Sequence, residues 1–94
     1  MILSFKDRHT EELWQTGKSR RMPAGLIRVA LRKLAQLNFA ARLEDLSAPP
    51  GNRLEALRGN RAGQMSFRIN SRFRICFVWR DGNAQGVEIV DYHA

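Results

Sequence analysis

Cysteine is almost absent from this 94-residue chain, which contains only Cys76. A single cysteine excludes an intramolecular disulfide, and its position in an apolar stretch favours a buried thiol. One cysteine and two widely separated histidines, His9 and His93, do not have the spacing of a zinc site. The sequence therefore predicts no bound metal.

Sequence motifs for cofactors and covalent catalysis are missing as well. The chain has no glycine-rich phosphate-binding loop, and several of its glycines stand in short connectors typical of hairpins. No serine or cysteine has the local signature of a nucleophile. The nine acidic residues are scattered and do not form the carboxylate cluster of a metal-dependent hydrolase. We therefore expect no cofactor.

Long hydrophobic runs are also lacking. No stretch approaches the roughly 20 apolar residues that span a bilayer, and the first residues do not resemble a signal peptide. We expect a cytoplasmic protein without membrane contact. The length of 94 residues predicts one domain, residues 1–94, with a modest core.

Positive charge, in contrast, is abundant. Sixteen Lys and Arg residues against nine Asp and Glu give a net charge of +7, and thirteen of the sixteen cations are arginines. Residues 18–42 hold seven cations and no acid, and residues 53–80 hold seven arginines and one acid. Arginine offers a planar fork of donors that suits phosphate. This pattern favours a nucleic acid or another acidic partner, with a solvated basic surface as the plainer alternative.

Two helices are predicted in the first half of the chain. Asp7 is a suitable N-cap for the first helix, and Gly17 is a typical residue at its end. The second helix has Pro23 in its first turn, followed by apolar residues at helical spacing over residues 26–37. Shorter features are also expected: a first strand at residues 1–5, a helical turn at 40–46 and a break at 47–52.

After residue 52 the hydrophobic period changes to two, which predicts strands joined by hairpins. With one sheet face packed on the helices, the chain should form an α+β domain of two layers, its two N-terminal helices against a curved, mostly antiparallel sheet. The opposite face should then expose Arg68, Arg72 or Arg74. The predicted strands are residues 53–58, 64–69, 72–79 and 86–92, and the last two are joined through DGNAQG.

Three consecutive residues, Asp91, Tyr92 and His93, combine an acid, a phenol and an imidazole. RNA carries its own nucleophile, the 2′-OH, so cleavage without metal needs a base, an acid and cations around the phosphate. The pKa range of His93 suits either proton transfer, and Glu55 or Asp91 can act as the base. Tyr92 can stack on a base or donate to the phosphate.

Arginines close to these residues can bind the phosphate, and Arg74 can also stabilise the transition state. Each candidate has a plainer explanation: a solvated histidine, a tyrosine at the edge of the core, or Glu55 and Arg74 as structural ion-pair partners. The residues alone thus support a basic RNA-binding domain with a candidate acid/base site. The predicted phosphate-binding arginines are Arg58, Arg61, Arg68 and Arg72.

Four motifs resemble a known family. L-x-x-L-[KR]-G fits residues 54–59, and G-Q-x-S-x-R-[IV]-N fits residues 63–70. W/F-R-I-C-F fits residues 73–77, and V-E-I-V-D-Y-H fits residues 87–93. In this combination, the chain closely resembles HigB-type toxins of the RelE/ParE superfamily, the plasmid maintenance killer family.

The resemblance implies the RelE-like microbial RNase fold and a toxin of a type II toxin–antitoxin pair. Such toxins cut mRNA in the A site of the 70S ribosome, without metal or cofactor, and inhibit translation and growth. A HigA-type helix-turn-helix antitoxin neutralises them, and operator DNA is bound only through the toxin–antitoxin complex. By the resemblance, Asp91, Tyr92 and His93 match the active-site triplet, Arg74 the strand arginine and Arg58 a Lys/Arg position.

The second acid/base group departs from the family pattern, because some relatives have histidine where this chain has Glu55. Either Glu55 takes the role of base, or His93 and Asp91 carry both proton transfers. Two other functions stay open: a ParE-like toxin that inhibits gyrase through the same sheet, and an RNA-binding or co-repressor module. The Asp-Tyr-His triplet and the basic sheet favour RNA cleavage.

Overall fold

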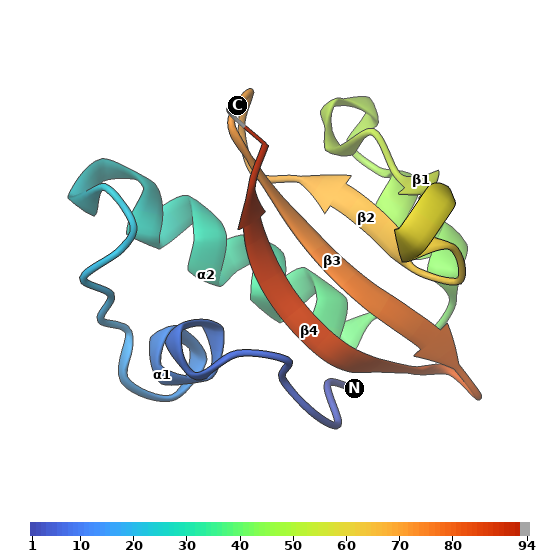
Figure 1. Ribbon diagram of the computed structural model, residues 1–94, viewed down its shortest axis with the longest axis horizontal. Helices are drawn as coiled ribbons and strands as arrows, with labels where there is room; N and C mark the ends of the chain where they lie inside the picture. Colours follow the sequence, from blue (N-terminus) through green and yellow to red (C-terminus); the bar gives the residue numbers. More distant parts are fainter. Residues whose placement is uncertain (93–94) are drawn as a thin grey trace.

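The computed structural model describes residues 1–92. Its centre is a four-stranded antiparallel sheet in the order β1-β2-β3-β4. The helix α2 runs along one face of the sheet, and α1 packs beside it against α2 and β4 (Figure 1). This is the α+β arrangement that the sequence predicts. The elements are α1 (Arg8–Thr16), α2 (Ala24–Phe39), β1 (Glu55–Ala56), β2 (Met65–Arg68), β3 (Phe73–Arg80) and β4 (Asn83–Asp91).

Both ends of α1 form as the sequence predicts. The side chain of Asp7 caps the helix by accepting a hydrogen bond of 3.2 Å from the backbone N–H of Thr10. Gly17 ends the helix in the left-handed region, with φ 75°, where a glycine has no steric penalty. For α2, Pro23 is the residue before the first turn and not a member of it.

The first residues do not form the predicted strand. They meet β4 in parallel through two isolated bridges, Ile2 to Ala84 and Phe5 to Val87. Side chains take part in this pairing: the Asn38 Oδ1 accepts from the backbone N–H of Ile2 at 3.0 Å. Because side chains replace some of the backbone hydrogen-bond partners, these first residues lie along the edge of the sheet without a continuous ladder of backbone hydrogen bonds.

The strand predicted at residues 53–58 is reduced to two residues. A short 3-10 helix, η2 (Pro50–Asn52), precedes it, and Arg53 then adopts φ 47°. This left-handed conformation cannot belong to a strand. Another 3-10 turn, η3 (Gly59–Arg61), follows, so that pairing with β2 is brief. The helical turn expected at residues 40–46 is the 3-10 helix η1 (Leu43–Ser47).

The last hairpin is tighter than predicted. Its turn is only Asp81 and Gly82, with φ 53° and 77°, as in the two-residue turns whose twist suits antiparallel strands. As a consequence, β4 begins at Asn83, three residues before the start that the sequence predicts at residue 86. A register shift between Cys76 and Val78 interrupts the pairing of β3 with β4 and indicates a bulge, which increases local twist.

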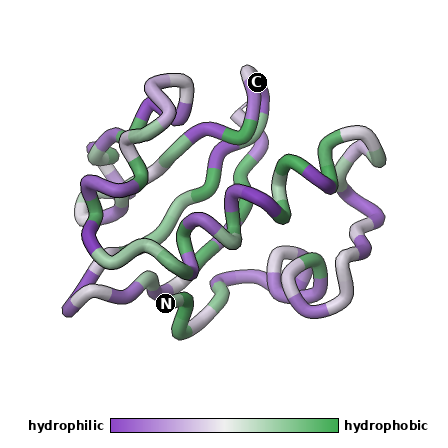
Figure 2. The backbone as a smooth tube through the Cα atoms, turned by 180° about the vertical axis from the view of Figure 1, so that it is seen from behind, coloured by the Kyte–Doolittle hydropathy of each residue, from purple (hydrophilic) through white to green (hydrophobic). Residues whose placement is uncertain are grey.

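The core lies between α2 and the inner face of the sheet. Phe67 and Phe77 are fully buried and meet edge to face, with ring centroids 6.0 Å apart. Leu34 and Leu37 of α2 are also fully buried. Burial of each of these side chains contributes roughly 1.5–3 kcal/mol. Because only one side of α2 faces this core, apolar and polar residues alternate along the helix (Figure 2).

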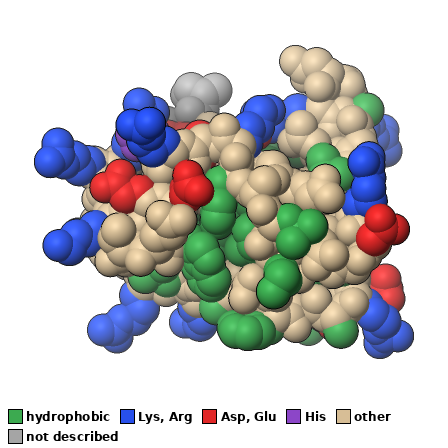
Figure 3. Space-filling view, turned by 90° about the horizontal axis from the view of Figure 1, so that it is seen from below, with side chains coloured by type: hydrophobic (Ala, Val, Ile, Leu, Met, Phe, Trp, Pro, Cys, Tyr) green, Lys and Arg blue, Asp and Glu red, His purple; other side chains and the backbone are tan. Residues whose placement is uncertain are grey.

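Some large apolar side chains remain at the surface. In the view from below, hydrophobic side chains gather in the middle of the face, while Lys and Arg lie mainly around its edges (Figure 3). Within residues 1–92, no helix is long and apolar enough to cross a bilayer. The large exposed apolar residues are Met1, Leu3, Phe39 and Tyr92.

Candidate functional site

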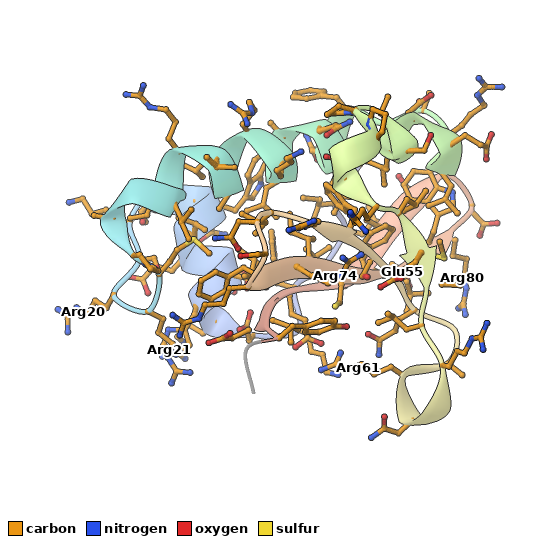
Figure 4. All side chains as sticks on the ribbon, turned by 90° about the horizontal axis from the view of Figure 1, so that it is seen from above. Arg20, Arg21, Glu55, Arg61, Arg74 and Arg80 are labelled. Carbon is orange, nitrogen blue, oxygen red and sulfur yellow. The ribbon has the colours of Figure 1, made fainter. Side chains whose placement is uncertain are left out.

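Arg74 is the central residue of the sheet face that points away from α2. Only 10% of its side chain is exposed. Its Nε donates to the Ser66 Oγ at 2.8 Å, and its Nη2 donates to the carbonyl oxygen of Arg53 at 2.7 Å. The same Nη2 lies 3.4 Å from the Glu55 Oε1. The guanidinium is therefore held in one orientation, with Glu55 directly beside it (Figure 4).

The fold brings these partners to Arg74 in two ways. Strand register places Ser66 of β2 opposite Cys76 of β3, the strand that carries Arg74, and places Glu55 of β1 opposite Ser66. Arg53 is placed by the turn before it, where Asn52 is fully buried. The amide of Asn52 donates to two carbonyl oxygens of the preceding segment, at 3.0 and 3.1 Å. A buried amide thus fixes the turn from which the Arg53 carbonyl reaches Arg74.

Tyr92 covers the other side of the Arg74 guanidinium. The guanidinium carbon lies 5.9 Å from the centre of the Tyr92 ring, a cation–π distance. The Tyr92 hydroxyl lies 3.9 Å from the Cys76 Sγ. Burial raises the pKa of Tyr92 above its usual range, and Cys76 adds to the shift. The phenol therefore keeps its proton at neutral pH and can donate a hydrogen bond.

Arg61 lies on the same side of the sheet, away from α2 (Figure 4). Its Nη1 donates to the Glu88 Oε2 and to the Gln64 Oε1, each at 3.1 Å. The hydrogen bond to Glu88 raises the pKa of Arg61. Lys6 shares the same carboxylate at 3.4 Å. Sequence reasoning missed Glu88, although it has the same strand parity as Tyr92.

Asp91 occupies a different place from Tyr92, although the two residues are neighbours in the chain. Arg72 donates hydrogen bonds to the Asp91 carboxylate. Its Nε lies 3.0 Å from each carboxylate oxygen, and its Nη2 lies 2.8 Å from one of them. The hydrogen bond to Asp91 raises the pKa of Arg72. Asp91 pairs in register with Phe73, and the Arg72 guanidinium carbon lies 5.0 Å from the centre of that ring. The structure thus brings Glu55 and Tyr92 to Arg74, and Asp91 to Arg72.

Two further predicted residues, Arg58 and Arg68, belong to other segments of the sheet region. Arg58 is exposed just before η3, and the Arg68 Nε donates to the carbonyl oxygen of Asn70 at 2.9 Å. His93 lies outside the described residues. Among residues 1–92, no three His, Cys, Asp or Glu side chains lie close enough together to hold a metal ion.

The prediction that the outer sheet face would expose arginine is wrong for Arg74, which is 8% exposed. The partners beside Arg74, including the Tyr92 ring, cover most of its surface. Cys76 of the same face is fully buried. Burial raises the pKa of the Cys76 thiol, as expected for a buried cysteine.

Sequence comparisons agree with this architecture. The family described as "RelE-like toxin of type II toxin-antitoxin system HigB" matches residues 3–93. Toxin HigB-1 of Vibrio cholerae is 41% identical over 85 residues, which cover 89% of this chain and 90% of that protein. Endoribonuclease HigB of Proteus vulgaris is 28% identical over 93 residues, covering 99% of this chain and 100% of that protein.

Solved structures with the same fold include YafQ of E. coli, with a TM-score of 0.57 and 9% identity over 98% of this chain and 94% of YafQ. A chain of the YoeB–YefM complex from Staphylococcus aureus has a TM-score of 0.58 at 16% identity, covering 100% of this chain and 99% of that one. At such low sequence identities, the structural likeness shows the fold alone. The family match, in contrast, extends over nearly the whole chain. The chain therefore belongs to the HigB-like family of RelE-like toxins of type II toxin–antitoxin systems.

Proposed function

We propose that this toxin is an endoribonuclease that cuts mRNA in the A site of the 70S ribosome, without a metal or cofactor. Membership of a type II system implies an antitoxin partner. In the proposal this partner is a HigA-type helix-turn-helix protein, which also carries the complex to operator DNA. The name of the Proteus vulgaris relative, an endoribonuclease, supports the activity.

The observation that carries the proposal is the fixed guanidinium of Arg74 with a carboxylate and a phenol beside it. Its Nε and Nη2 are bonded to Ser66 and Arg53, and no hydrogen bond within residues 1–92 involves its Nη1. The Nη1 of Arg74 can therefore donate a hydrogen bond to a phosphate oxygen. A donor that is oriented before the substrate arrives stabilises developing charge without reorganisation.

The proposed reaction has two proton transfers. Glu55 takes the proton of the 2′-OH, the 2′-oxygen attacks the phosphorus, and the bond to the 5′-oxygen breaks. His93 gives that leaving oxygen its proton, so the products are a 2′,3′-cyclic phosphate and a 5′-OH. Each proton transfer contributes about 10²- to 10⁴-fold. Arg74 and Arg61 stabilise the charge on the phosphorane.

Glu55 fits the role of base better than Asp91 does. Glu55 is 3.4 Å from Arg74, and 55% of its side chain is exposed, so that substrate can reach it. Asp91 instead holds Arg72 at the end of β4. In this assignment Asp91 positions the end of the strand from which Tyr92 and His93 follow. Tyr92 donates to the phosphate, because its raised pKa keeps the phenol protonated.

Expression without antitoxin tests the proposal. Wild type should arrest growth and create new mRNA 5′ ends at fixed codon positions, whereas His93→Ala should create none. Growth arrest without new 5′ ends would contradict a nuclease and favour a target such as gyrase. Cleavage by His93→Ala at the wild-type rate would exclude His93 as the acid. In a purified assay on programmed ribosomes, treatment of the toxin with EDTA, followed by removal of the EDTA before the assay, should leave the rate unchanged.

A further inference from the structure

A cleft of about 250 Å³ lies between α1 and the connector that leads to α2, close to the end of β4. Its rim carries His9, Arg21 and Asp91. A second hollow shares His9 and Ser19 with it and adds Glu12 and Arg20. The floor of the cleft is apolar and consists of Leu13, Met22, Phe73 and Ile89.

We propose that this cleft is a subsite for one nucleotide of the RNA, next to the nucleotides that are cut. The base of that nucleotide enters the cleft, and the phosphate of the same nucleotide binds Arg20 and Arg21. The inference rests on the proposed function, because it extends the path of the same substrate. It assigns a role in substrate recognition to α1 and the connector, where the sequence predicts only a helix and a basic linker.

The size and lining of the cleft suit a nucleobase. Its volume of about 250 Å³ is just below the roughly 300–1,000 Å³ of typical ligand pockets, so it can hold a single ring system. An apolar floor with polar groups at the rim is the usual surrounding of an unstacked base. His9 is exposed, and imidazole and guanidinium planes are common stacking partners for RNA bases.

The charges that remain available at the cleft are positive on balance. Arg20 and Arg21 are exposed, and neither has an ion-pair partner within residues 1–92. Two of the nearby acids are already used, since Asp7 caps α1 and Asp91 binds Arg72. Glu12, which lines the second hollow beside Arg20, leaves one carboxylate against the two guanidinium groups. The site therefore suits an anion with a flat apolar body better than a basic side chain of the antitoxin.

Hydrogen bonds hold the backbone of the connector that carries Arg20 and Arg21. The Ser19 Oγ accepts from the backbone N–H of Arg21 and from that of Met22, both at 3.2 Å. Met22 is buried, which fixes the connector against the core. In Figure 4, Arg20 and Arg21 project from the end of the molecule opposite Arg80. The backbone that carries the two arginines is thus held, which lowers the entropic cost of bringing both cations to one phosphate.

The cleft and the Arg74 cluster meet at the end of β4. Asp91 lies at the rim of the cleft, and the next residue, Tyr92, covers Arg74. An RNA strand with one phosphate on Arg74 can pass this end of the sheet and place a neighbouring nucleotide in the cleft. Because Arg74 and Glu55 lie on the sheet face that points away from the helices, the subsite should affect binding more than the chemical step.

Two double charge reversals provide a matched test. Arg20→Glu/Arg21→Glu alters the cleft, and Arg28→Glu/Arg32→Glu makes the same charge change at exposed positions of α2. Both are measured for kcat and KM of mRNA cleavage on programmed ribosomes. The cleft variant should raise KM roughly tenfold with little change in kcat, and the control should raise it far less. His9→Ala should change the nucleotide preference at one position beside the cut.

The outcomes separate the inference from the proposed function. Lack of cleavage by wild type would overturn the proposed function and the subsite with it. Cleavage by wild type, with equal KM for the two double variants, would overturn the subsite alone. Unchanged cleavage together with lost binding of the purified antitoxin would assign the cleft to the antitoxin and also overturn the subsite. Thermal unfolding checks that both variants are folded.

Discussion

Arg72 and Arg74 stand two residues apart in the chain, yet their surroundings differ. Arg74 is 8% exposed and bonds to Ser66, Arg53 and Glu55 from two other segments. Arg72 is exposed and bonds to Asp91, with half of its side chain open to solvent. One arginine is thus part of the packed structure, and the other forms a surface ion pair.

The difference shows what burial does to a charged side chain. A buried guanidinium must have its donors satisfied, so the fold supplies acceptors on several sides and removes its freedom to move. An exposed pair is screened by water and salt and contributes little to stability. Arg74 is therefore suited to act as a fixed catalytic donor, and Arg72 is suited to hold the end of β4.

Replacement of Arg74 should have the largest effect. Arg74→Ala should slow cleavage by an amount equal to about 2–4 kcal/mol, because a donor to the transition state is lost. It should also lower the free energy of unfolding by about 1–3 kcal/mol, since the Ser66 hydroxyl and the Arg53 carbonyl lose their donor. Single-turnover cleavage and urea unfolding measure the two effects. Arg80→Ala, at the exposed end of the same strand, is the control.

A smaller effect is expected from Asn52, which acts on Arg74 through the carbonyl of Arg53. Asn52→Ala removes the amide that bonds to two carbonyl oxygens, one of them buried, and to the Lys33 ammonium. We expect a loss of about 2–3 kcal/mol in the free energy of unfolding. Cleavage should fall as well, because Arg53 is no longer held. Asn60→Ala, at an exposed turn, should change neither quantity.

Lys33, which bonds to Asn52, makes the free energy of unfolding depend on pH in a predictable direction. Burial and the neighbouring Arg32 lower the pKa of Lys33 below 10.5. The folded state therefore binds the proton less tightly than the unfolded state, and stability rises as pH increases from the folded pKa toward 10.5. Urea unfolding at a series of pH values should show this rise in wild type. In Lys33→Met the rise should be absent, and a persistent rise would contradict the assignment.

Tyr92 offers a direct test of the cover over Arg74, because it is the only tyrosine of the chain. Its raised pKa predicts that phenolate absorbance appears at higher pH in the folded protein than in urea. The stabilising contribution is present below about pH 10, the unfolded value, and is lost as pH rises through the folded pKa. Equal titration curves in both states would show that Tyr92 does not pack against the sheet.

Replacement of Arg72 should have the smallest effect. Arg72→Ala removes an exposed pair with Asp91, so the midpoint of urea unfolding should stay close to that of wild type. Cleavage should fall modestly, because the end of β4 is held less firmly. If Arg72→Ala reduced cleavage as much as Arg74→Ala does, the contrast between the two arginines would be wrong.

Local chemistry explains which parts of the fold could be predicted. The capping residue Asp7 and the terminal Gly17 identify α1, and the apolar period identifies α2. Alternation predicts β2 and β3 within one residue of their ends. The left-handed conformation of Arg53 shortens β1, and nothing in the local sequence indicates that conformation.

The site was predictable as a set of residues but not as an arrangement. The motifs select Arg74, Glu55 and Tyr92, and the structure brings these three together. That Asp91 instead binds Arg72 depends on contacts at the end of β4. The burial of Arg74 depends on Arg53, 21 residues away in the chain, which no short pattern reveals.

The rate of cleavage by Arg74→Lys tests the central claim most directly. Lysine keeps the charge but lacks the fork of donors that Ser66 and Arg53 hold in place. With Arg80→Lys as the control, the account predicts a loss of at least about tenfold for Arg74→Lys and none for the control. Cleavage by folded Arg74→Lys at the wild-type rate would contradict it.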